Sequence, residues 1–260
     1  MANRKRRPTR RQRRARARRL RVGGATLAAF CAVAAAAALY LTSTPVPTRS
    51  LTVLAIDRSM SMAAPRAEGA DADVFDLATR LANRRGAVMV DRIGNQSELA
   101  WKADIQCDTD SPSKCRGELA RYSVEVRAAA GRVLESPARG GSDILASLRS
   151  AELYRTTLDH KVDTVQVSMV TDGLHNADFD LLKSLRQGKS VDQLVKMARS
   201  GHSLPDDCGG FEVSFYHVIV PNAFGGDHVT PDEAHQVQEF WREALRTCGG
   251  RVTAWSPNAV

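Results

Sequence analysis

Two apolar runs, each followed at once by small oxygen-bearing side chains, most constrain what this chain can fold into. The runs are residues 51–56 and 165–170; Asp57 follows the first, and Thr171-Asp172-Gly173 follows the second. Continuous apolar runs of this length are typical of strands buried on both faces of a parallel sheet. Open α/β sheets bind ligands at the carboxyl ends of their strands, so the sequence predicts a binding site beside these oxygens.

A third segment, Gly140-Gly141-Ser142-Asp143, opens a helical pattern with the same kind of side chain. Carboxylate and hydroxyl oxygens are hard ligands, which suit Mg2+ or Mn2+ better than zinc. The sequence therefore predicts a divalent-metal site. Its candidate ligands are Asp57, Ser59, Ser61, Ser142 and Asp172.

Strands and helices alternate from residue 51 onward. We expect strands at 51–57, 86–92, 98–105, 163–171, 211–220 and 251–255. We expect helices at 70–84, 117–135, 143–157, 190–199 and 231–246, with the rest of 173–210 irregular. This alternation predicts an α/β fold, a doubly wound, mostly parallel Rossmann-like sheet with helices on both faces, in one domain at 51–260.

The charge of the chain is concentrated at its N-terminus. Residues 1–22 carry 12 of the 37 Lys and Arg and no acid, so 25 basic against 29 acidic residues leave a net charge of −4 in 23–260. A basic globular surface for nucleic acid is therefore not expected. The tail itself is interpreted as a cytoplasmic topology signal that also grips anionic lipids; a nucleic-acid-binding arm is the alternative.

An uncharged segment at 23–42 follows the basic tail. Twenty residues at helical rise span about 30 Å, the thickness of the hydrocarbon core of a bilayer. We interpret the segment as a transmembrane signal-anchor, joined by a Pro-rich linker at 43–50 to a domain outside the cell membrane. A cleaved signal peptide and a secreted protein are the alternative, and both place the domain outside the cytoplasm.

The cysteines suit an oxidising compartment. Cys107 and Cys115 bracket a short polar loop that could close on itself. Cys208 and Cys248 each precede an expected strand by three residues, so if those strands are parallel neighbours the two thiols lie within disulfide reach. We therefore expect the disulfides Cys107–Cys115 and Cys208–Cys248, with four unpaired thiols as the alternative.

The three oxygen-bearing segments, in this order, resemble the metal-site segments of von Willebrand factor type A (VWA) domains. The matching residues are Asp57-x-Ser59-x-Ser61, Gly141-Ser142-Asp143 and Thr171-Asp172-Gly173, and the similar element pattern covers about 51–255. The resemblance implies a VWA-like fold, and together with the Arg/Ala-rich N-terminal segment it leads us to expect a membrane-anchored bacterial protein. It also implies a metal-ion-dependent adhesion site (MIDAS).

The resemblance also implies a role for each ligand. Ser59 and Ser61 would bind the metal directly, while Asp57 and Asp172 would act through bound waters. Ser142 stands where the family normally has a threonine, so the hydroxyl is kept and the methyl group is lost. Asp143 would cap a helix rather than bind the metal.

With both carboxylates acting through bound waters, only neutral hydroxyls contact the dication directly, which leaves it under-neutralised in its first shell with a coordination position open to solvent. We therefore expect a non-enzymatic domain that binds a protein partner through an Asp or Glu of that partner, as many members of the family do. One alternative is a structural or assembly subunit with a vestigial metal site. Another is an Mg2+-dependent hydrolase like the haloacid-dehalogenase phosphatases, but their second aspartate is replaced by Ser59.

His175 lies three residues after Asp172 and could tune ligand binding; an ordinary loop histidine is the alternative. The segment 173–210 borders the expected metal face. Loops beside a binding site often set partner choice, and the role of this one is left open by the sequence.

Overall fold

The structure is a computed structural model, and every described residue lies in the unit Pro47–Val260. The described ranges are 50–59, 62, 67–82, 86–106, 112–138, 140–218 and 229–257. Within these ranges, no helix is both long enough and apolar enough to cross a bilayer. The expected tail at 1–22, membrane segment at 23–42 and linker up to residue 49 lie outside them, so those predictions stay predictions.

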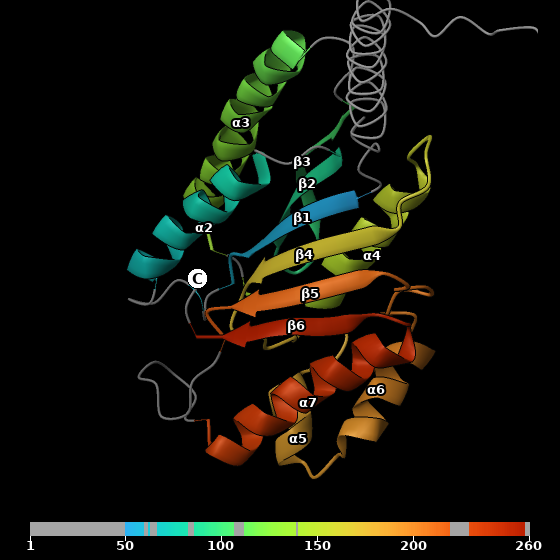
Figure 1. The fold of residues 1–260 in the computed structure, drawn as a ribbon. Helices are drawn as coiled ribbons and strands as arrows, with labels where there is room; N and C mark the ends of the chain where they lie inside the picture. The colour runs from blue at the N-terminus through green and yellow to red at the C-terminus, as the bar shows by residue number, and fades with distance from the viewer. Residues whose placement is uncertain are drawn as a thin grey trace, which may run out of the picture. The chain divides into compact units, whose positions relative to one another are not determined.

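The strands form one six-stranded sheet in the order β3-β2-β1-β4-β5-β6 (Figure 1). Their bounds are β1 Ser50–Asp57, β2 Gly86–Ile93, β3 Glu98–Ile105, β4 Thr164–Val170, β5 Phe211–Tyr216 and β6 Arg251–Ser256. All neighbours are parallel except β2 and β3, which pair antiparallel. The carboxyl ends of β1, β4 and β5 consequently meet at one edge of the sheet, where Asp57 ends β1.

Helices cover both faces of this sheet. They are α2 Ala67–Ala82, α3 Pro112–Glu135, α4 Ile144–Thr156, α5 Leu181–Arg186, α6 Val191–Ser200 and α7 Pro231–Thr247. Successive side chains of a strand point to opposite faces. In β1, Leu54 and Ile56 pack with α2 and α3, while Val53 and Ala55 pack with the core that α4, α5, α6 and α7 share. Figure 1 shows α2 and α3 together on one side and α5, α6 and α7 on the other.

The predicted mixed α/β architecture is confirmed, and most elements end within a few residues of their expected bounds. One exception is α3, which begins at Pro112 rather than at 117, and the others lie after residue 172. The strand expected at 211–220 ends at Tyr216, because His217 takes a left-handed conformation with φ 60°. The short helix α5 stands in a segment expected to be irregular, where Asp180 caps it by accepting from the Lys183 amide at 2.9 Å.

The predicted disulfide between Cys208 and Cys248 is present, with the two Cα atoms 4.9 Å apart. Its sequence argument holds, since β5 and β6 are parallel neighbours and Glu212 pairs with Arg251. Cys115 is also disulfide-bonded. Its predicted partner, Cys107, lies outside the described residues.

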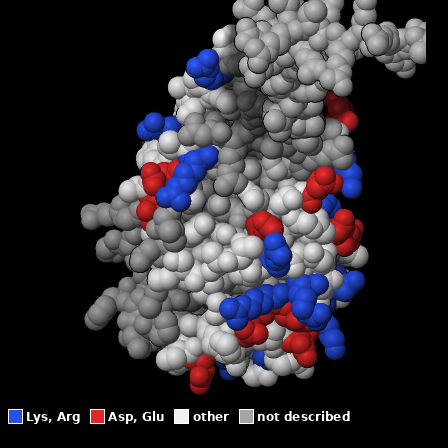
Figure 2. Space-filling model, viewed as in Figure 1, with Lys and Arg blue, Asp and Glu red and all other residues white. Residues whose placement is uncertain are grey.

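The described surface carries charges of both signs. Near α7 and β6, Figure 2 shows basic and acidic side chains side by side rather than one sign gathered in a patch. Ion pairs account for part of this pattern, such as Arg246 with Glu243 on α7 and Arg251 with Glu212 between the two strands. This face therefore carries no large patch of a single sign.

Candidate metal centre

Asp57 is the centre of the candidate site. Its side chain is buried, with 3% of the residue exposed, at the carboxyl end of β1. The Ser142 hydroxyl donates to both carboxylate oxygens, at 3.1 and 2.9 Å, and the Thr171 hydroxyl donates to Oδ2 at 2.7 Å. The Ser59 amide donates to Oδ1 at 2.8 Å, and its hydroxyl also hydrogen bonds this carboxylate. Segments far apart in the chain therefore converge on one carboxylate.

Backbone contacts hold the Ser142 segment in place. Ser142 and Asn176 form a reciprocal pair, because the Ser142 amide donates to Asn176 Oδ1 and the Asn176 amide donates to the Ser142 carbonyl at 3.1 Å. The Asp143 amide donates to the Gly94 carbonyl, 2.7 Å away in the turn after β2. The segment is thus fastened both to the β2–β3 turn and to the loop after β4.

Asp172 directly follows Thr171 at the end of β4 and is 2% exposed. Its Oδ1 accepts from the Leu174 amide at 2.9 Å. Gly173 has φ 81°, and a Cβ added there would lie 2.9 Å from the Trp255 ring. The Trp241 indole donates to the Gly173 carbonyl at 2.8 Å. Two tryptophans therefore fix the turn that presents Asp172, and only glycine fits it without strain.

Burial is the main electrostatic fact at this site. Burial first, and the negative charge of Asp172 second, raise the pKa of Asp57 from 3.8 to about 7, against hydrogen bonds from Thr171 and Ser59 that lower it. Two buried carboxylates this close repel each other when both are ionised. A divalent cation between them would remove that repulsion. The oxygens of the neighbouring hydroxyl groups are ligands that suit Mg2+ or Mn2+. The residues present fit such an ion.

The structure brings four of the five candidate ligands together: Asp57, Ser59, Ser142 and Asp172. Ser61 lies outside the described residues. Asp143 caps α4, as expected, because its Oδ1 accepts from the Ala146 amide at 2.9 Å.

Three supporting residues were not singled out from the sequence: Thr171 as an Asp57 partner, Asn176 and Trp241. Of the three, only Thr171 could have been predicted to contact Asp57, because it directly follows β4, which lies beside β1 in the sheet. The contacts of Asn176 and Trp241 join distant segments and leave no local pattern.

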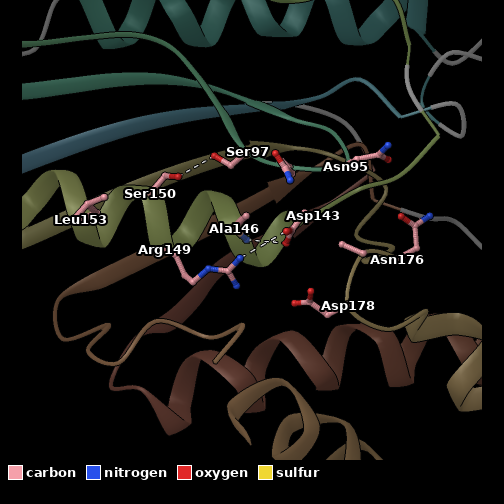
Figure 3. Close-up of a pocket in the computed structure, with 11 residues that line it drawn as sticks. Asn95, Ser97, Asp143, Ala146, Arg149, Ser150, Leu153, Asn176 and Asp178 are labelled. Atoms are coloured by element: carbon pink, nitrogen blue, oxygen red, sulfur yellow. Dashed lines mark hydrogen bonds and ion pairs between the residues drawn. The ribbon is translucent and has the colours of Figure 1, made fainter. Parts of the chain in front are cut away.

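A pocket of about 750 Å³ lies on the other side of the Ser142 segment, between the turn after β2, α4 and the loop after β4 (Figure 3). Asp143, Arg149 and Asp178 line it, and Figure 3 shows their side chains facing one another. His175 is fully buried beside them, with Nδ1 3.9 Å from Asp143 Oδ1. It is therefore a core residue rather than a loop histidine in contact with solvent.

None of the protein-family models matches the sequence, and no curated protein matches it. Among solved structures, the chain is similar to the PilB minor pilin from Streptococcus sanguinis, at 12% identity and a TM-score of 0.52, over 83% of this chain and 59% of the pilin. At this identity, the likeness to the pilin shows a shared fold alone.

VWA domains are also among the matched structures. The von Willebrand factor type A protein from Catenulispora acidiphila is 17% identical with a TM-score of 0.46, over 79% of this chain and 38% of that one. The SpRpn10 VWA domain is 13% identical with a TM-score of 0.39, over 81% and 90% of the two chains. The chain spans less than two thirds of the pilin and of the Catenulispora protein. Its own six-stranded, mostly parallel sheet with helices on both faces is the doubly wound α/β arrangement expected from the sequence.

Proposed function

We propose that this protein is a metal-dependent protein-binding domain of the VWA type, anchored in the cell membrane and displayed on its outer side. The observation that carries the proposal is the buried carboxylate pair of Asp57 and Asp172, surrounded by the hydroxyls of Ser59 and Ser142. Burying two acids side by side is costly unless a cation compensates them. The site is therefore best explained as a built cation site.

The proposed ion is Mg2+ or Mn2+, held by Asp57, Ser59, Ser61, Ser142 and Asp172. With two carboxylates against one dication and neutral hydroxyls for the remaining contacts, the ion keeps its affinity for further oxygen ligands. We propose that a partner protein supplies an Asp or Glu carboxylate to that ion. Binding would then require both the ion and the acidic residue of the partner.

A binding role is favoured over a catalytic one by the side chains around Asp57. Among the described residues, those that hydrogen bond its carboxylate are hydroxyl-bearing, namely Ser59, Ser142 and Thr171. A hydroxyl that donates to a carboxylate positions it and does not serve as a general base at neutral pH. We propose that the domain is not an enzyme.

Display outside the cytoplasm is supported by the cysteines. The Cys208–Cys248 bond joins the loop before β5 to the end of α7, and Cys115 is disulfide-bonded as well. Disulfides persist in oxidising compartments and are rare in the cytosol. The apolar segment at 23–42 would supply the anchor.

Calorimetric titration of the full-length chain in detergent with Mg2+ and Mn2+ tests this proposal. We expect binding by the wild type and at least a tenfold loss of Mg2+ affinity in Asp57→Asn, which keeps the size of the side chain and removes its charge. Asp159→Asn makes the same change at an exposed position and serves as the matched control. Absence of Mg2+ and Mn2+ binding by the folded wild type would contradict the proposal and favour a structural subunit.

A further inference from the structure

His175 is a buried polar side chain whose ring nitrogens have no hydrogen-bond partner among the described residues. Its side chain is 0% exposed. The ring packs against Phe179 in a tilted arrangement, with the ring centroids 4.9 Å apart. Buried polar groups are almost always hydrogen-bonded, and an exception points to a water or an ion. Burial also lowers the pKa of His175 to about 4, so the ring is neutral at pH 7, the form that binds metals.

Two carboxylates stand next to this ring. One ligand atom from each of Asp143, His175 and Asp178 lies within 4.8 Å of the other two. Asp143 is buried at the start of α4, and Asp178 is exposed at the pocket rim, where Figure 3 shows both side chains. The set thus joins an unpartnered imidazole to two acids from separate segments of the fold.

We propose that Asp143, His175 and Asp178 form a second cation site, distinct from the Asp57 site and suited to a transition-metal dication such as Mn2+ or Zn2+. One imidazole nitrogen and two carboxylate oxygens favour such ions, because Mg2+ and Ca2+ prefer oxygen ligands alone. The remaining coordination positions face the pocket and are filled by water or by a ligand. The imidazole gives this site a chemistry that the all-oxygen Asp57 site lacks.

The carboxylates keep enough acceptor capacity for a metal. Asp143 Oδ1 accepts from the Ala146 amide, and Asp178 Oδ2 accepts from the Ser203 hydroxyl. A carboxylate has about four lone-pair sites, so each retains free ones. With metal–ligand bonds of about 2.1 Å, two ligand atoms of one ion lie at most about 4.2 Å apart and three lie closer on average, so binding would draw the set inward. Asp178 is the exposed member of the set and is held by the Ser203 hydroxyl, so it is the ligand with the most room to move.

The positive charge of Arg149 lowers the affinity of this second site for a dication. Its Nη2 lies 3.6 Å from Asp143 Oδ2, and its Nη1 donates to the Ser203 carbonyl, which holds the guanidinium beside the set. A fixed positive charge offsets part of the attraction of the two carboxylates for a dication. The imidazole ligand therefore matters more here than at a site with carboxylates alone, and its removal should abolish binding.

Pulsed electron paramagnetic resonance of Mn2+ bound to the full-length chain in detergent tests this inference. A directly bound imidazole nitrogen modulates the spin echo of Mn2+, whereas the all-oxygen Asp57 site gives no such signal. We expect the nitrogen signal in the wild type, its persistence in Asp57→Asn, and its loss in His175→Leu. His160→Leu is the matched control, because His160 also lies beside an acid, with Nδ1 3.4 Å from Asp104, and should leave the signal unchanged.

Asp178→Asn provides a second variant that spares the core, since the residue is exposed. We expect it to weaken Mn2+ binding at the nitrogen-coordinated site at least tenfold. A wild type without the nitrogen signal at saturating Mn2+, or a signal that survives in folded His175→Leu, would overturn the inference. Failure of the proposal for the Asp57 site would give a different result. The number of Mn2+ ions bound per chain would then be the same in Asp57→Asn and in the wild type.

Discussion

At the scale of single residues, the candidate ligands could be predicted because each belongs to a short segment next to a strand or a helix start. Asp57, Ser142 and Asp172 follow from that pattern, and the structure places Ser142 and Asp172 beside Asp57. The burial of His175 and the indole of Trp241 beneath Gly173 could not be predicted. Both depend on packing between segments far apart in the chain, for which one sequence carries no local signal.

The raised pKa of Asp57 makes metal binding pH-dependent. Burial and Asp172 raise this pKa to about 7, so the proton and the metal compete for the same carboxylate near neutral pH. Lowering the pH through 7 protonates Asp57 and should weaken Mg2+ binding about tenfold between pH 8 and pH 6. Calorimetric titrations at pH 6, 7 and 8 measure this. An unchanged affinity across the range would show that Asp57 is not a ligand of the ion or that its pKa is not raised.

Gly173 should be the least replaceable glycine near the site. Gly173→Ala places a Cβ at φ 81° and 2.9 Å from the Trp255 ring. We expect it to lower the free energy of unfolding by about 1–3 kcal/mol and to weaken Mg2+ binding, because Asp172 moves with the turn. Denaturant unfolding and calorimetry measure the two effects.

Gly188→Ala is the control for this substitution. Gly188 has nearly the same φ, 82°, and nothing lies within 4 Å of its added Cβ. It should show the backbone cost alone, about 1 kcal/mol, with Mg2+ affinity unchanged. Equal effects of the two substitutions on Mg2+ binding would contradict the role given to the Gly173 turn.

At the scale of elements, the pattern of apolar residues decided which strands and helices could be predicted from the sequence. The strand β1 is almost wholly apolar inside its ends, β4 alternates apolar residues with Gln166 and Ser168, and both were predicted to within a residue at most ends. The helix α5 was missed because six residues with Lys183 and Ser184 among them give no clear period. The start of α7 was predictable from Thr230, whose hydroxyl and the Glu233 side chain form a reciprocal cap. A cap therefore marks a helix end only when the helix itself is long enough to show a period, as α7 is and α5 is not.

The Cys208–Cys248 disulfide should stabilise the β5–α7–β6 part of the domain. It closes a loop with a sequence separation of 40 residues, and loops of this size give roughly 2–4 kcal/mol. We expect the double substitution Cys208→Ser/Cys248→Ser to lower the free energy of unfolding by about that amount. Denaturant unfolding measures it, with Cys31→Ser as a control outside the bond. A loss below about 0.5 kcal/mol would show that the bond adds little to the fold.

At the scale of the whole molecule, the fold places the candidate metal site at the edge where the parallel strands end, as expected for an open α/β sheet. The anchor and the compartment were derived from 1–42 and the cysteines. The Cys208–Cys248 bond agrees with an oxidising compartment. Topology remains a prediction that only the intact cell can test.

Protease treatment of intact cells tests the orientation. We expect the domain after about residue 45 to be accessible to protease added outside the cell, while a tag at the N-terminus stays protected. A cytoplasmic protein serves as the control for cell integrity. Protection of the domain in cells with an intact membrane, followed by digestion on lysis, would contradict display on the outer side.

The central claim is that a divalent cation sits between Asp57 and Asp172, and diffraction from Mn2+-soaked crystals tests it most directly. The account predicts an anomalous difference peak within about 2.2 Å of the Ser59 and Ser142 hydroxyl oxygens. Asp57→Asn crystals soaked in the same way should lack that peak. A well-ordered wild-type site without anomalous density at saturating Mn2+ would contradict the account.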